Sequence, residues 1–201
     1  MPKGKTVNIA LDLDACGYRF EKGHRIRLAL STSYWPTVLP APTDPGVTID
    51  TATLTLSMPL LGDHDHVDMP EPTNLDPLPK YLTHTPGETR RSVERDLSLG
   101  VTHYKIYEDG GLSEHQGNGL ATQDIREERW SITDGDPLSM TGACRWTCNE
   151  QREGWAVRTV ITANLACTAT EWQTSGSVTA FEGETKIFRK TYDKRIPRDF
   201  L

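Results

Sequence analysis

The sequence has no long helical pattern, no long hydrophobic run and few cysteines. No apolar stretch approaches the ~20 residues that a membrane-spanning helix needs. Residues 1–13 alternate in polarity and do not contain the continuous apolar core of a secretion signal, so we expect a cytoplasmic protein. Four cysteines without a C-x-x-C pair are too few for a disulfide scaffold, and we interpret them as reduced, mostly buried thiols.

Recognisable catalytic motifs are also missing. No G-x-S-x-G nucleophile string, Gly-rich phosphate loop, H-E-x-x-H string or Walker motif occurs in the 201 residues. The sequence therefore predicts no catalytic residue and no cofactor in this chain.

The charge balance is acidic. The chain carries 22 Lys and Arg against 28 Asp and Glu, a formal net charge of −6. Nucleic acid and anionic membranes attract basic surfaces, so neither is expected as a main partner.

Alternation of apolar and polar residues is the main positive signal, and it predicts strands. They are expected at residues 7–13, 26–30, 48–58, 101–107, 125–132, 140–148, 155–167, 178–181 and 186–192. Ten of the 13 prolines lie between Pro36 and Pro86, and proline cannot donate to a strand ladder. We expect an all-β antiparallel protein with a partial sandwich over 1–58, a Pro-rich connector over 59–88, and a further β region over 89–201 that packs on or completes the sandwich.

A specific resemblance lies in Gly17–Pro36, where an aromatic residue precedes a turn, the string Gly-His-Arg-Ile-Arg-Leu, a Ser-rich stretch and a proline. This order resembles the C-terminal, non-catalytic domain of X-Pro dipeptidyl-peptidases and cocaine-esterase-like serine hydrolases. The resemblance implies a jelly-roll, galactose-binding-like β-sandwich packed against an α/β-hydrolase domain that carries the Ser-Asp-His triad. It therefore implies an accessory role in ester or peptide hydrolysis, with no triad residue in this chain.

The resemblance also leaves the leading strands of the jelly roll and the triad domain unaccounted for. Unpaired sheet edges and large apolar patches attract partners, so we expect a separate α/β-hydrolase domain or chain, or a second copy pairing by its edge strands. The interface or substrate-entrance candidates are Tyr34, Trp35, Arg25 and Arg27.

Other polar residues have simpler interpretations. His24 is expected to be a buried histidine beside a tight turn, because no orienting partner accompanies it. His64 and His66, in an acidic string, are weak metal-ligand candidates, and a solvated loop is the preferred interpretation. Cys144, Cys148 and Cys167 are expected to be small buried residues rather than metal ligands.

Three alternatives stay open. The chain could be an independent carbohydrate- or protein-binding sandwich, using Trp35, Tyr34 or Trp172 for a sugar. It could be a self-standing enzyme with an unfamiliar site. It could also be a fragment of a longer gene product.

Overall fold

The computed structural model describes residues 4–43, 46–62, 68–73 and 78–198. The chain divides into two units, Met1–Ser31 and Thr32–Leu201, each taken by itself below. The described residues contain no helix, and hence none that could cross a membrane.

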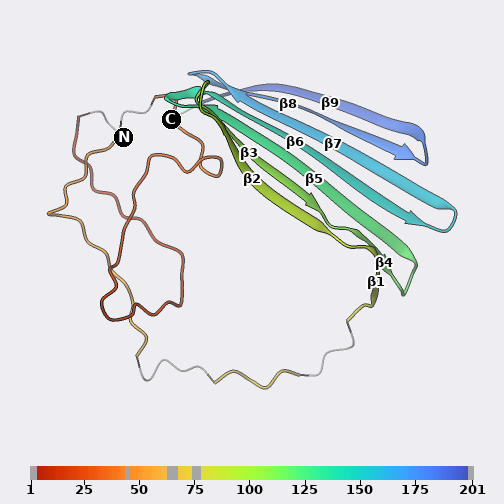
Figure 1. The fold of residues 1–201 in the computed structure, drawn as a ribbon, viewed down its shortest axis with the longest axis horizontal. Helices are drawn as coiled ribbons and strands as arrows, with labels where there is room; N and C mark the ends of the chain where they lie inside the picture. Colours follow the sequence, from red (N-terminus) through yellow and green to blue (C-terminus); the bar gives the residue numbers. More distant parts are fainter. Residues whose placement is uncertain (1–3, 44–45, 63–67, 74–77, 199–201) are drawn as a thin grey trace. The chain divides into compact units, whose positions relative to one another are not determined.

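In the described residues, all of the regular structure lies in the second unit, as nine strands of one antiparallel sheet (Figure 1). The strands are β1 (Tyr81–Thr85), β2 (Glu88–Asp96), β3 (Val101–Asp109), β4 (Leu112–His115), β5 (Leu120–Thr133), β6 (Asp136–Arg152), β7 (Trp155–Cys167), β8 (Glu171–Glu182) and β9 (Thr185–Pro197). The all-β, antiparallel prediction is thereby confirmed.

Sequence neighbours pair in the sheet from β5 to β9, which gives a meander of long strands. On the other side, β5 pairs with β4 through its first residues and with β3 through the rest. β1 then pairs with β4, and β2 with β3. The sheet therefore ends at β9 on one side and at β1 and β2 on the other.

Glycine allows the sharp reversals between these strands. Gly135, Gly154 and Gly183 have φ values of 71°, 73° and 54°, and each stands in the turn that joins two long strands. These φ values lie in the left-handed region, which glycine adopts without steric cost. Gly111, with φ 72°, separates β3 from β4, and a Cβ there would lie 2.7 Å from the Gly87 backbone N.

Because alternate residues of a strand point to opposite sides, the register divides the sheet into two faces. The apolar face is defined by side chains that stand in register across β5 to β8, namely Trp130, Cys144, Trp146, Ile161, Ala163, Leu165, Trp172 and Val178. The polar face is defined by Arg129, Ser131, Thr141, Asn164, Ser175 and Asp193.

The sequence predicted the later strands well. The expected strands from 101–107 to 186–192 all lie within β3 and β5 to β9. β1 falls inside the expected connector 59–88, and β2 follows with charges on both faces, which hides its period. The tail from Arg195 was expected to be irregular, but β9 continues to Pro197.

The expected strands at 7–13, 26–30 and 48–58 are not formed. None of the three segments forms a ladder; residues 48–58 instead make a local turn, in which Thr53 N–H donates to the Asp50 carbonyl at 3.3 Å. A strand needs a neighbour for its backbone groups, and apolar alternation alone does not supply one. The division at residues 58 and 88 remains a prediction.

Candidate functional site

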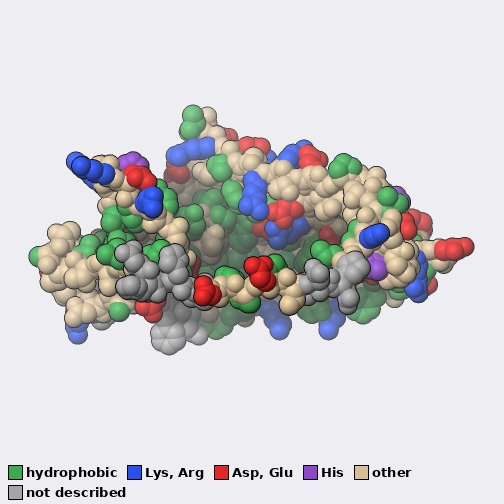
Figure 2. Space-filling view, turned by 90° about the horizontal axis from the view of Figure 1, so that it is seen from below, with side chains coloured by type: hydrophobic (Ala, Val, Ile, Leu, Met, Phe, Trp, Pro, Cys, Tyr) green, Lys and Arg blue, Asp and Glu red, His purple; other side chains and the backbone are tan. Residues whose placement is uncertain are grey.

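The apolar face of the sheet is largely uncovered. Trp146 and Trp155 are 43% and 37% exposed, while Phe188 and Ile196 on β9 are 49% and 47% exposed. Among the described residues, the only buried hydrophobic side chains are Ala121 and Met140. Figure 2 shows hydrophobic side chains gathered together, with charged side chains in their midst. A contiguous apolar surface of this kind marks a place where another protein layer packs.

Four charged side chains on the apolar face of β2, β3 and β5 neutralise one another. Arg91 and Arg126 each place Nη2 2.7 Å from a different oxygen of the Glu108 carboxylate. Arg126 Nε lies 3.3 Å from Glu128 Oε1, and the Trp130 indole N–H donates to Glu128 Oε2 at 3.0 Å. The hydrogen bond from Arg91 is the largest effect that holds the pKa of Glu108 below its ordinary 4.5. Two arginines and two glutamates thus form a paired cluster that a covering layer could bury without stranding a charge.

Cys144 and Cys148 lie on the same face of β6. Burial is the main reason that the pKa of Cys144 rises above 9.0. For Cys148, burial and a hydrogen bond to Asp124 raise the pKa to about 11. Cys167 is half-buried, with Sγ 3.8 Å from the Leu138 carbonyl. A thiol with a raised pKa is a poor nucleophile, so Cys144 and Cys148 pack rather than react.

Metal ligands do not cluster in the described part of the chain: no group of three or more His, Cys, Asp or Glu there could hold an ion. His64 and His66 lie outside the described residues.

Arg198 ties the end of the sheet to the segment before it. Its side chain is 7% exposed, and its guanidinium carbon lies 4.1 Å from the centre of the Trp172 ring. Nη1 donates to the Thr168 carbonyl at 3.0 Å and Nη2 to the Pro40 carbonyl at 2.9 Å. Sequence reasoning missed this residue, because a single arginine in a terminal segment carries no pattern. Arg198 therefore covers one face of the Trp172 ring.

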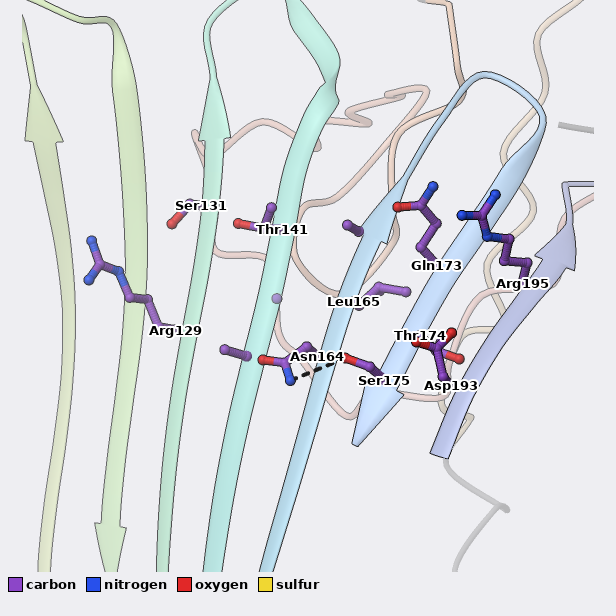
Figure 3. Close-up of a pocket in the computed structure, with 13 residues that line it drawn as sticks. Arg129, Ser131, Thr141, Asn164, Leu165, Gln173, Thr174, Ser175, Asp193 and Arg195 are labelled. Atoms are coloured by element: carbon purple, nitrogen blue, oxygen red, sulfur yellow. Dashed lines mark hydrogen bonds between the residues drawn. The ribbon is translucent and has the colours of Figure 1, made fainter. Parts of the chain in front are cut away.

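The polar face carries a hollow of about 580 Å³ across β5 to β9 (Figure 3). Figure 3 shows Arg129 and Arg195 on opposite sides, with Asn164 between them. Asn164 Nδ2 donates to Ser175 Oγ at 3.4 Å, and Arg195 lies 3.7 Å from Glu171. Hydroxyl, amide and guanidinium groups of this kind hydrogen-bond polar ligands.

A serine and a histidine meet beside this hollow. His103 Nδ1 lies 2.7 Å from Ser131 Oγ, and Arg129 Nη2 lies 3.4 Å from His103 Nε2. The Arg129 guanidinium faces Nε2, and the Ser131 hydroxyl faces Nδ1. An arginine therefore stands where a catalytic triad has a carboxylate. The pair is therefore arranged as a structural contact.

The sequence-predicted interface residues lie before the sheet. Tyr34 is 72% exposed, and its backbone exchanges hydrogen bonds with Val38 at 3.0 and 2.7 Å. Trp35 is half-buried, and its indole N–H has no protein partner among the described residues. Arg25 and Arg27 are exposed in the first unit, as is His24, which was expected to be buried. None of these residues lies in a strand of the sheet, whose apolar face is the larger feature.

Comparison with known families agrees with the resemblance in Gly17–Pro36. Residues 1–76 match the model of the X-Pro dipeptidyl-peptidase C-terminal non-catalytic domain. No curated protein and no solved structure matches the chain.

Proposed function

We propose that this chain is an accessory, non-catalytic β portion of an X-Pro dipeptidyl-peptidase-like or cocaine-esterase-like serine hydrolase. It docks on an α/β-hydrolase catalytic domain or chain, braces it and shapes its substrate entrance. The hydrolysis of an ester or peptide bond, by acyl transfer to serine followed by attack of water, belongs to that partner.

The match of residues 1–76 to a non-catalytic family supports the accessory role. The observation that carries the docking proposal is the exposed apolar face, centred on Trp146 and Trp155. The arginine–glutamate cluster on that face is already paired, so covering this part of the face removes apolar surface from water at little electrostatic cost. The Ser131–His103 contact supports the same view, since the other ring nitrogen of His103 faces the Arg129 guanidinium and not a carboxylate.

The docking proposal predicts the effect of one substitution. Trp146 exposes 43% of its side chain, or about 100 Å² of a tryptophan surface of ~250 Å². At about 25 cal/mol per Å², covering that area contributes about 2.5 kcal/mol. Trp146→Ala should therefore weaken docking by between about tenfold and a hundredfold.

The test is a calorimetric titration of the full chain with an α/β-hydrolase catalytic domain of this family from the same organism. Tyr107→Ala is the matched control, because Tyr107 is an aromatic residue on the polar face, beneath Arg90. Docking that weakens with Trp146→Ala and not with Tyr107→Ala supports the proposal. If the wild-type chain does not bind the catalytic domain at all, the proposal is wrong.

A second function, binding of a carbohydrate, is favoured by the hollow on the polar face. Its Asn164, Gln173, Ser175 and Arg129 side chains offer the donors and acceptors that sugar hydroxyls require. A glycan array with wild type and Asn164→Ala separates the two functions: saturable binding lost in the variant, without any hydrolase, would favour this one.

A further inference from the structure

The two margins of the sheet differ in their charge. β9 pairs only with β8, and all 13 of its residues are exposed (Figure 1). β2, at the opposite margin, pairs only with β3 and is likewise exposed throughout. Both strands present unpaired backbone N–H and C=O groups, which are a template for another strand.

At the β2 margin, the arginines are paired with carboxylates. Its arginines are Arg90, Arg91 and Arg95, and each lies beside a carboxylate: Glu88 at 3.1 Å, Glu108 at 2.7 Å, and Asp134. β2 also carries as many acidic as basic residues.

At the β9 margin, most of the cations have no carboxylate within ion-pair distance in the described part of the chain. The strand carries five cations and a single carboxylate, Asp193, in a chain whose net charge is −6. The cations are Lys186, Arg189, Lys190, Lys194 and Arg195. In the described part of the chain, only Arg195 lies within ion-pair distance of a carboxylate, and that distance is 3.7 Å. Lys190 instead lies over the Tyr192 ring, with Nζ 5.2 Å from its centre.

These charges disfavour a second copy at this margin. Antiparallel pairing of β9 with β9 would place basic strands side by side, and like charges on adjacent strands are destabilising. The same charges attract an acidic strand. The apolar residues Phe188, Tyr192 and Ile196, each close to half exposed, add surface against which such a strand can pack.

We propose that β9 accepts an extended, acidic segment of a partner protein as an added strand of the sheet. The backbone edge supplies hydrogen bonds, and the unpaired cations select the acidic occupant. The cations divide by face: Lys190 and Lys194 stand in register with the apolar face, and Arg189 with Thr179 on the polar face. This inference rests on the proposed function only in taking the partner to be a protein, and its test does not use the hydrolase.

The probe is a 13-residue peptide of alternating Glu and Val, matched in length to β9, and an alternating Lys and Val peptide is its control. Each is titrated into the full chain by fluorescence anisotropy at low and high salt. Hydrogen exchange then locates the backbone amides that gain protection. We expect the Glu peptide to bind more tightly, to weaken as salt rises, and to protect β9.

Charge-reversed variants complete the experiment. Lys190→Glu with Lys194→Glu should weaken the Glu peptide by about tenfold, because two attractions become repulsions. Arg90→Glu with Arg95→Glu makes the same charge change on β2 and should leave binding unchanged.

Three results would overturn the proposal: equal binding of both peptides, new protection elsewhere than β9, or protection in the free chain of the outward-facing β9 amides, those that do not bond to β8. None of these bears on whether the hydrolase docks on the apolar face, so the two proposals can fail separately.

Discussion

Gly142 and Trp130 provide a quantitative test of packing on the apolar face. The Trp130 ring lies against Gly142 on the adjacent strand, so that a Cβ at residue 142 would be 2.6 Å from Cζ3 and 2.8 Å from Cε3. The indole cannot yield freely, because its N–H is held by Glu128 at 3.0 Å. Gly142→Ala must therefore displace the ring or the strand.

Overpacking of this kind costs about 1–3 kcal/mol. A loss near 2 kcal/mol lowers the melting temperature of a protein of this size by about 4–8 °C. Urea denaturation of wild type and Gly142→Ala measures the difference. Gly17→Ala is the control, because a Cβ there meets nothing within 4 Å, and its effect should stay within about 0.5 kcal/mol.

The cause is tested by a double-mutant cycle. In a Trp130→Ala background the obstructing ring is gone, so Gly142→Ala should cost little or should stabilise the strand. An equal loss of stability in both backgrounds would refute the steric explanation.

Further predictions concern thiols, pH and turns. An aromatic disulfide reagent at pH 8 should modify the exposed Cys16 first. Cys148 has a pKa of about 11, so its thiol should react only at higher pH or when the protein unfolds. Fast reaction of Cys148 at pH 8 would contradict its burial. The pKa of Glu108 is lower in the folded protein than its ordinary 4.5, so the ionised carboxylate stabilises the fold above about pH 4.5. This stabilisation is lost as the pH falls through the lowered pKa of the folded state. The stability difference between wild type and Glu108→Gln should therefore shrink on acidification in urea titrations, and a constant difference would contradict the ion pairs. Gly111→Ala should destabilise the protein more than Gly154→Ala does. Both glycines have φ near 72°, but only at Gly111 would the added Cβ meet backbone, at 2.7 Å from Gly87 N.

The sequence predicts the half of the fold in which strands are neighbours along the chain. β6 and β7 alternate in polarity along most of their length and are joined by a glycine turn, so pattern and pairing coincide. β2 escaped prediction because its charged residues occupy both faces. At residues 7–13 the pattern is as clear as in β7, but no partner strand pairs with it, and pattern alone cannot supply backbone hydrogen bonds.

The candidate site could be predicted only in part. The family resemblance in Gly17–Pro36 was visible in the order of its residues. The apolar face could not be predicted, because the register of the strands decides which side chains meet on it, such as Trp146 opposite Ile161. The charge contrast between β9 and β2 likewise depends on which carboxylates fold next to which cations.

Hydroxyl-radical footprinting with and without the hydrolase catalytic domain tests the docking claim most directly, because it reads side-chain exposure residue by residue. Trp146 and Trp155, which are 43% and 37% exposed in the free chain, should lose most of their oxidation in the complex. Tyr107 and Phe181, on the polar face, should react as before. Unchanged oxidation of both tryptophans in a complex that has formed, or protection of the polar face instead, would contradict the account.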